Sequence, residues 1–469
     1  MKRHTPGRAL VAAVTGGALL ALMGACSSDP GTTPDDTTPA DPGASVDTEA
    51  PVTISVSDYP STEEPELRAD FEARVEAFTA LYPNITIVAD ETVYAPDTFQ
   101  AMLAGGTMPN TLRIPYTDIA GLIERQQVAQ ITDYLPDFEV IGELNPSMMD
   151  SVTDDAGETW GVPVSAYSMA LIYNRALFEQ AGLDADAPPA SWEEVREAAQ
   201  AIDGQTDAQG YSTMTTDTAG GWILSATSVG FGGTLQNVDG TEATVAQGGV
   251  AEALQFLQTL RWEDDVMGSN FLVDWNAAYQ GFAAGQIGMM VGGSDSFGTL
   301  HKTFGMDADA VGIAPLPQAA DGLGTQGGGT IVVVSPDSEP DQIHAALRWI
   351  EFNEFGKFSD QELAVSQAEA TIEGGWVVGG PEMRLVSEDV YDTWLGWIDE
   401  YINVPRENFD AFISTVEDLP LISEPATRGQ DTYALLSPVV QAVLTEQDAD
   451  VDALLADAQT AVQGLIDAG

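Results

Sequence analysis

Short apolar segments with the pattern of β-strands alternate along this chain with amphipathic segments that have the period of a helix. Residues 52–57, VTISVS, alternate apolar and polar side chains as a half-buried strand does. Residues 66–81 follow with one apolar helical face that begins at Leu67, and ITIVA at 85–89 is predicted to be the next strand. Because strands separated by helices tend to join a parallel sheet, the alternation predicts an α/β fold.

The same pattern continues to the end of the chain. Ser191 and Glu194 have the spacing of a capping box, and Asp450 precedes a C-terminal amphipathic ladder that it can cap. No fixed-period repeat is apparent, which disfavours solenoids and propellers. Further helices are predicted at 98–103, 118–127, 191–202, 250–262, 276–284 and 341–352, and further strands at 111–115, 287–293, 310–317 and 327–336.

The N-terminus has the organisation of an export signal. Three basic residues are followed by an apolar run at 9–23, which is shorter than the roughly 20 residues of a membrane span. Cys26 is the only cysteine, so no internal disulfide can form. The sequence LMGAC resembles the bacterial lipobox, in which the cysteine is acylated and becomes the new N-terminus; the alternative is a chance cysteine beside an ordinary signal peptide. We therefore predict a lipoprotein signal peptide at 1–25 and lipid attachment at Cys26.

Length and charge limit the folded part and its partners. Residues 26–50 are polar and rich in Pro and Thr, as in a disordered tether. About 420 residues remain, more than one core usually organises, so two lobes are expected. Asp and Glu number 73 against 16 Lys and Arg, for a net charge of -57. Such a chain repels nucleic acid and anionic lipid, and the scattered acids favour a solvated coat over attraction of a cationic ligand.

Several stretches, taken in order, resemble a known family. They resemble the extracellular solute-binding proteins of ABC importers, in the carbohydrate-binding branch typified by maltose-binding protein, over nearly all of residues 52–466. The stretches are WGVPVSAYSMALIYNRALFEQAGL, FAAGQIGMMVGGSDSF and VGIAPLPQAADGLGTQGGGTIVVVSP, followed by an Ala-rich helix.

This resemblance implies a two-lobed, periplasmic-binding-protein-like fold of type II. Each lobe would be a mixed, mostly parallel sheet flanked by helices, with the ligand cleft between the lobes. Lobe 1 is expected at 51–165 plus 310–337 and lobe 2 at 168–306 plus 340–469. The crossing segments are expected near 164–170, 306–312 and 335–341, and GTQGGG is interpreted as a hinge-side turn.

The resemblance also explains why an apolar strand near residue 170 contains two tyrosines. The equivalent strand of the family passes from the first lobe to the second, and its start faces the ligand. Independently, ligands of open α/β sheets bind in the crevice where the chain leaves one sheet for another. Tyr167 is therefore predicted to project into the cleft as a flat, amphipathic surface, whereas Tyr173 lies deeper and is expected in the core.

Four other residues are candidates for contact with a sugar, which combines apolar ring faces with hydroxyl groups. Asp118 matches a family carboxylate that accepts sugar hydroxyls, and a simple helix cap is the alternative. Trp222 and Trp376 are flanked by glycines, which would leave each indole exposed in a turn. Asp295 stands where the family commonly has a tryptophan, so the ligand could be smaller, more hydroxylated or cationic. A cap of the following turn is the alternative for Asp295.

Signals for an enzyme are poor. His4 lies in the predicted signal peptide, and His301 and His344 are far apart with no cysteine in a plausible site. Ser-His and Cys-His nucleophile systems and a His-rich zinc site are therefore disfavoured, and no catalytic residue, metal or cofactor is predicted. A paired-carboxylate glycosidase stays open because 73 acids always offer pairs.

The sequence thus predicts a monomeric, lipid-anchored receptor on the extracellular face of the cell membrane. It would capture a sugar, from a mono- to an oligosaccharide, and deliver it by hinge closure to the permease subunits of an ABC importer. The alternatives are a binding protein for a cationic or polyol solute, which Asp295 motivates, and a secreted carbohydrate-active hydrolase.

Overall fold

The computed structural model describes residues 48–468 of the 469. The predicted signal peptide, Cys26 and nearly all of the predicted tether lie outside the described residues. Within residues 48–468, no helix is both long enough and apolar enough to cross a membrane.

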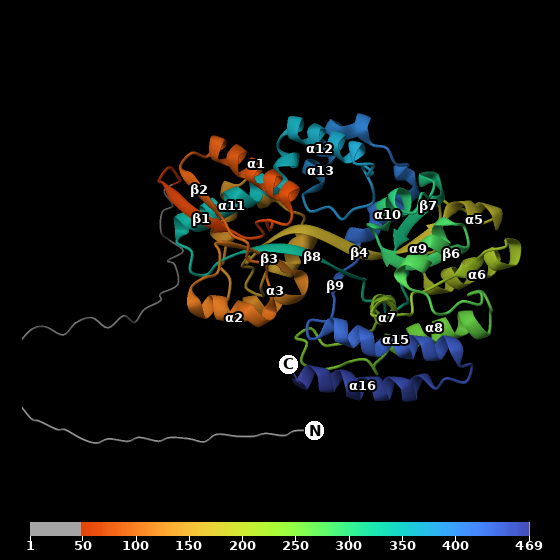
Figure 1. The fold of residues 1–469 in the computed structure, drawn as a ribbon. Coiled ribbons are helices and arrows are strands. Elements are labelled where there is room, and N and C mark those ends of the chain that lie inside the picture. The colour runs from red at the N-terminus through yellow and green to blue at the C-terminus, as the bar shows by residue number, and fades with distance from the viewer. Residues whose placement is uncertain (1–47, 469) are drawn as a thin grey trace, which may run out of the picture. The chain divides into compact units, whose positions relative to one another are not determined.

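Strands and helices alternate through the first part of the chain, as the sequence predicts (Figure 1). The elements are β1 (Val52–Val56), α1 (Pro65–Leu81), β2 (Ile85–Ala89), α2 (Pro96–Gly105), β3 (Thr111–Pro115), α3 (Tyr116–Glu124), α4 (Pro146–Met149), β4 (Val162–Asn174), α5 (Arg175–Gln180), α6 (Trp192–Gln205), β5 (Gln209–Tyr211), α7 (Ala219–Gly230), α8 (Gly249–Trp262) and α9 (Trp275–Ala283).

The second part contains the last four strands and is mostly helical after β8. Its elements are β6 (Ile287–Gly293), α10 (Ser296–Lys302), β7 (Val311–Pro315), β8 (Thr325–Val334), α11 (Pro340–Phe355), α12 (Gln361–Glu373), α13 (Glu388–Ile398), α14 (Asp410–Thr415), β9 (Leu421–Ser423), α15 (Gly429–Thr445) and α16 (Val451–Ala468). The capping box of Ser191 and Glu194 is present, and the Asp450 carboxylate accepts a bond from the Ala453 amide at 3.1 Å. Both predicted caps are confirmed.

The strands form one mixed sheet in the order β2-β1-β3-β8-β4-β6-β5, with β7 on β4 and β9 on β8. The long strand β4 belongs to two ladders. Its first half, to Ser168, pairs with β8, and its second half, from Met169, pairs with β6 and β7. The chain thus crosses from one half of the sheet to the other within β4, as the resemblance implies (Figure 1). Every antiparallel ladder involves β4 or β8.

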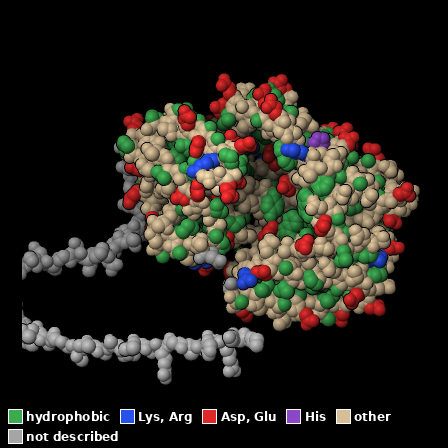
Figure 2. Space-filling model, in the orientation of Figure 1, with side chains coloured by type: hydrophobic (Ala, Val, Ile, Leu, Met, Phe, Trp, Pro, Cys, Tyr) green, Lys and Arg blue, Asp and Glu red, His purple; other side chains and the backbone are tan. Residues whose placement is uncertain are grey.

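Acidic side chains are spread over the visible face of the described residues, whereas basic ones are few (Figure 2). This distribution agrees with a solvated acidic coat rather than with one concentrated acidic patch.

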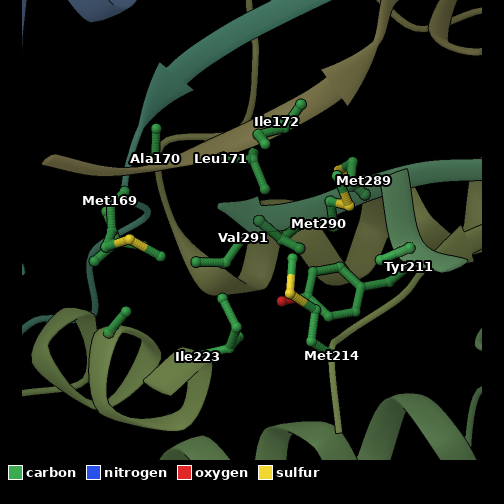
Figure 3. Close-up of a cluster of buried hydrophobic side chains, with 14 of the residues drawn as sticks. Met169, Ala170, Leu171, Ile172, Tyr211, Met214, Ile223, Met289, Met290 and Val291 are labelled. Carbon is green, nitrogen blue, oxygen red and sulfur yellow. The ribbon is translucent and has the colours of Figure 1, made fainter. Parts of the chain in front are cut away.

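Buried side chains divide into groups on the two sides of this crossing. We call the clusters that pack around β1, β3 and the start of β4 the first core; they include Ile54, Phe78 and Leu112. The second core packs around the end of β4 and around β6. Figure 3 shows Leu171 and Ile172 of β4 beside Met290 of β6 in this second core.

The predicted assignment of segments to lobes is wrong in two places. Strand β7 pairs with β4 at Ala170–Asn174, and Ile313 packs in the second core, whereas residues 310–337 were assigned to lobe 1. Helices α11, α12 and α13 pack in the first core through residues such as Trp349 and Trp394, whereas 340–469 was assigned to lobe 2. Residues 306–312 stay within the second core and residues 335–341 within the first, so neither segment is a crossing. The chain returns to the second core between Ile398 and Phe409.

Three smaller expectations also fail. Leu67 is 55% exposed, so the buried face of α1 begins at Phe71. Gly327, Gly328 and Gly329 of GTQGGG lie inside strand β8 and Gly324 directly precedes it, so this segment is mainly strand rather than a hinge-side turn. Trp222 lies inside helix α7 rather than in a turn. The glycine before it, Gly221, allows α7 to pack closely against α15. A Cβ at Gly221 would lie 2.2 Å from the Tyr433 carbonyl oxygen of α15.

This close approach predicts that Gly221→Ala destabilises the protein. The added methyl group meets backbone that cannot move alone, so we expect unfolding free energy to fall by about 1–3 kcal/mol. Gly204→Ala in α6 is the matched control, because nothing lies within 4 Å of its Cβ. Gly204→Ala should raise the free energy of unfolding by about 0.5–1 kcal/mol, because glycine destabilises a helix relative to alanine. Urea unfolding of both variants measures the difference, and equal stabilities would contradict the packing argument.

Candidate ligand-binding site

The carboxylate of Glu424, just after β9, accepts hydrogen bonds from three aromatic side chains. The Tyr167 hydroxyl donates to Oε1 at 2.5 Å, and the Trp222 indole nitrogen donates to the same oxygen at 3.1 Å. The Tyr433 hydroxyl donates to Oε2 at 3.1 Å. We call these four residues the Glu424 cluster. One acid thereby fixes two of the predicted ligand-binding rings relative to each other.

Each member of the cluster comes from a different element. Tyr167 lies on β4 at the point where its pairing passes from β8 to β6, Trp222 on α7 and Tyr433 on α15. Gly328 of β8 lies beside the Tyr167 ring, since a Cβ there would be 3.2 Å from the phenol oxygen. The glycines of β8 therefore leave room for this tyrosine.

The surroundings keep both tyrosines of the cluster protonated. Burial raises the pKa of Tyr167, and the charges of Glu424 and Asp295 raise it further. Burial and the Glu424 charge likewise raise the pKa of Tyr433. Both hydroxyls therefore stay donors at physiological pH, which a carboxylate acceptor requires.

The strand register brings the segment of Asp295 near that of Tyr167. The Ser294 amide donates to the Ser168 carbonyl oxygen at 2.9 Å, directly beyond the β4–β6 ladder. Desolvation by the surrounding protein raises the pKa of Asp295 above its ordinary 3.8. Asp295 stands at the start of α10 but makes no side-chain capping bond, which disfavours its alternative role as a cap.

Trp376 lies in the turn after α12 and is 45% exposed, as predicted for an indole in a glycine-flanked turn. Together with Asp295 it lines a cavity of about 350 Å³, which we call the Trp376 cavity. The Lys302 ammonium lies 3.7 Å from the centre of the Trp376 ring. One face of this indole is therefore already covered by a cation.

Asp118 lies apart from the other predicted residues. It is in the first turn of α3, which begins at Tyr116, so the alternative that it caps this helix is wrong. Desolvation raises its pKa, while a hydrogen bond from Tyr94 and the charge of Arg125 lower it. Among the contacts of residues 48–468, none joins Asp118 to the Glu424 cluster. The structure thus brings together Tyr167 and Trp222 through Glu424, places the segment of Asp295 near Tyr167 and leaves Asp118 on the first core.

A hollow separates the two parts of the described chain in the space-filling view, and apolar and acidic side chains lie within it (Figure 2). In the same orientation, β4 and β8 pass from one part to the other (Figure 1). Few basic side chains are visible at this hollow (Figure 2).

Glu424 and Tyr433 were not predicted from the sequence. LISEPATRG offers only a short apolar strand before a proline, and Glu424 is one of 73 acids. Tyr433 lies on a helix whose period predicts a buried position but no partner. Only the tertiary structure, which joins residues 257 positions apart in the chain, shows their contacts. No group of three or more potential metal ligands occurs within residues 48–468.

Comparison with known families supports this architecture. The profile of the family described as "Bacterial extracellular solute-binding protein" matches residues 61–355, well over half of the chain. A protein of Brucella abortus (strain 2308) named "Putative binding protein" is 28% identical over 153 residues, 32% of this chain and 34% of that one. The chain therefore matches about a third of the length of the curated relatives.

Solved structures show the same fold. The cyclic alpha-maltosyl-1,6-maltose binding protein from Arthrobacter globiformis superimposes with a TM-score of 0.64 at 23% identity, over 90% of this chain and 100% of that one. UgpB from Mycobacterium tuberculosis, in complex with glycerophosphocholine, gives a TM-score of 0.58 at 16% identity, over 89% and 99%. Both likenesses confirm the predicted two-lobed α/β fold.

The Glu424 cluster predicts that Glu424→Gln destabilises the protein. A glutamine amide presents one acceptor oxygen in place of two, so at least one buried donor loses its partner. We expect unfolding free energy to fall by about 1–3 kcal/mol. Glu76→Gln, at an exposed position of α1, should change it by less than about 0.5 kcal/mol. Denaturant unfolding compares the two variants, and equal midpoints would show that the cluster adds no stability.

Proposed function

The chain belongs to the bacterial extracellular solute-binding proteins, and from this premise we propose that it captures a sugar and delivers it to the permease of an ABC importer. The solute would range from a mono- to an oligosaccharide. The observation that supports a sugar is the Glu424 cluster, in which one carboxylate holds the rings of Tyr167 and Trp222 at the sheet crossing. Aromatic planes pack against the C–H faces of a sugar, and fixed rings lose little entropy on binding.

Carboxylates near these rings would accept hydrogen bonds from the hydroxyl groups of the sugar. The segment of Asp295 lies near Tyr167, and the Asp295 carboxylate can accept sugar hydroxyl protons. Three of the four acceptor positions of the Glu424 carboxylate are taken by the protein. Glu424 is therefore a positioning residue that orients Tyr167 and Trp222. Asp118 would join the ligand from the first lobe only when the lobes close.

Closure is the step that couples capture to transport. The two cores have separate hydrophobic clusters, and β4 and β8 connect them. A ligand that contacts both lobes favours the closed form by its differential affinity for it. The closed surface is what the permease subunits would recognise. We further propose that Cys26 anchors a monomeric receptor to the outer face of the membrane by lipid, which the sequence alone supports.

A cationic solute is the second candidate. None of the ion pairs within residues 48–468 involves Asp118, Asp295 or Glu424. A cationic solute could therefore balance the negative charges of these carboxylates. Glycerophosphocholine, the ligand of the UgpB structure, contains a cationic group. The scarcity of basic groups around the cluster disfavours anionic solutes under either proposal.

Ligand binding should raise the thermal stability without changing the solute. With a panel of mono- and oligosaccharides, polyols, choline and glycerophosphocholine, we expect a sugar to raise Tm by mass action. Titration calorimetry gives the dissociation constant, and chromatography of the incubated sugar should recover it intact. A rise in Tm only with choline-bearing solutes would favour the second candidate, whereas a hydrolysed sugar would reassign the protein to the hydrolases.

Sugar affinity should fall in acid through Asp295. Its ionised form is the better acceptor, and because its pKa is raised above 3.8, the loss begins at a higher pH than for an ordinary aspartate. Asp295→Asn should weaken binding about tenfold at pH 7, the effect of one charge-assisted hydrogen bond, and flatten the pH profile. Asp448→Asn, at an exposed position, is the control. Calorimetry between pH 4 and 8 measures both, and an unaltered profile in Asp295→Asn would exclude this role.

A further inference from the structure

The segment between α12 and α13 lies against both cores of the chain. Met383 packs in the second core, and Val386, three residues farther on, packs in the first core. The Asn145 amide donates to the Leu385 carbonyl oxygen at 2.9 Å, and Leu144 and Val386 form an antiparallel bridge. The backbone of this segment is therefore fixed to the first lobe, while some of its side chains reach the second lobe.

Arg384 makes a bidentate ion pair from this segment to the second lobe. Its guanidinium donates to both carboxylate oxygens of Glu417, with 2.6 Å between Nη2 and Oε2. Glu417 follows α14, and its neighbour Val416 packs in the second core. The side chains of Arg384 and Glu417 are only 19% and 23% exposed, so salt screens this pair less than a pair on the open surface. Because a planar, two-bond contact has a fixed geometry, the pair forms at one spacing of the lobes only.

Two further cations join the lobes beside this ion pair. The Lys302 ammonium, on α10 in the second lobe, lies 3.7 Å from the centre of the Trp376 ring in the turn after α12. Arg406, which begins the short helix that ends at Phe409 in the second core, donates to the Gly379 carbonyl oxygen at 2.9 Å. We call three contacts together the interlobe strap: Arg384–Glu417, Lys302–Trp376 and Arg406–Gly379.

Similar contacts within one lobe differ from the strap in position rather than in chemistry. Lys357, the other lysine after the N-terminal leader, lies 4.8 Å from the centre of the Trp394 ring, and both side chains belong to the first lobe. Arg196 and Asp264 form a bidentate pair at 2.6 and 2.9 Å within the second lobe. These contacts stabilise one lobe in any arrangement, whereas the strap exists only while the two lobes keep their present spacing.

The strap is made while the candidate ligand site is open. A hollow lies between the two parts of the chain in this arrangement (Figure 2), and Asp118 of the first lobe is apart from the Glu424 cluster. Closing the hollow moves the lobes relative to each other, and lengthening the Arg384–Glu417 bonds by about 1 Å already ends them. Water then replaces each lost partner, so release has a modest net cost. The strap is therefore suited to breaking and forming again.

We propose that the interlobe strap holds the ligand-free protein in its open form and is released when the lobes close. A ligand that binds the closed form must break the strap, so the strap lowers the apparent affinity by favouring the open form. This inference requires that the lobes move, but it does not require the solute to be a sugar.

Distances between spin labels on the two lobes test the strap without any ligand. Labels are attached at Glu76→Cys of α1 and Asp457→Cys of α16, both exposed positions, in a Cys26→Ser background that leaves no other cysteine. Double electron–electron resonance gives the distribution of distances. Arg384→Met and Glu417→Gln should each raise the population with the shorter, closed distance about fivefold, the effect of one partly buried bidentate ion pair. Two variants are used so that one misfolded protein does not decide the result.

Matched controls separate release of the lobes from general damage. Lys302→Met should shift the distances in the same direction, whereas Lys357→Met and Arg196→Met break contacts within one lobe and should leave the distances unchanged. The charge swap that combines Arg384→Glu with Glu417→Arg should restore the original distribution. Unchanged distances in both ion-pair variants, or equal shifts in the two within-lobe controls, would overturn the inference.

Ligand affinity gives a second measurement of the same effect. A solute that raises the Tm of the unaltered protein should bind Arg384→Met about fivefold more tightly, because less free energy is then needed for closure. Weaker or equal binding would contradict the strap. If no solute of the panel binds, the proposed function fails, and the label distances still decide whether the strap holds the lobes open.

Discussion

The arrangement of this molecule depends on one strand that is shared by two ladders. Strand β4 has 13 residues, and its hydrogen bonds pass from β8 to β6 and β7 at Ser168 and Met169. A strand cannot shift its register in one ladder without moving every side chain in the other. Tyr167, at this change of partner, is therefore held in place by the sheet itself. The ligand-binding candidates assemble around the point where the backbone is most constrained.

Glycines in β8 make that assembly sterically possible. Gly329 has φ +153°, and a Cβ there would lie 2.0 Å from the Ser165 carbonyl oxygen. Gly328 faces the Tyr167 ring. Side chains at these positions would force β8 away from β4 and would open the crossing. A run that suggests flexibility in the sequence thus serves close packing in the structure.

The negative charge of the Glu424 carboxylate is stabilised by neutral hydrogen-bond donors rather than by cations. The Glu424 carboxylate is bound by two phenols and an indole, so its charge is stabilised while the field around it stays negative. The two lysines lie instead on tryptophan rings at the Trp376 cavity. A neutral polar ligand fits such a site better than an anion does, because it needs acceptors and flat apolar faces rather than counter-ions.

The sequence by itself determined the local elements and their order. The period of apolar residues located β1, β2 and β6 to within a residue, and the polar residues before two helices identified their caps, because these signals depend on near neighbours alone. The family resemblance and the crossing between sheets pointed to Tyr167, and flanking glycines pointed to Trp222, although Trp222 lies in a helix rather than in the predicted turn. Only the tertiary structure decided that α11–α13 pack in the first core and that Glu424 and Tyr433 meet these two rings. The reason is physical: an amphipathic helix specifies that one face is buried, but not against which sheet. A carboxylate likewise finds its donors through contacts between residues that lie more than 200 positions apart in the chain.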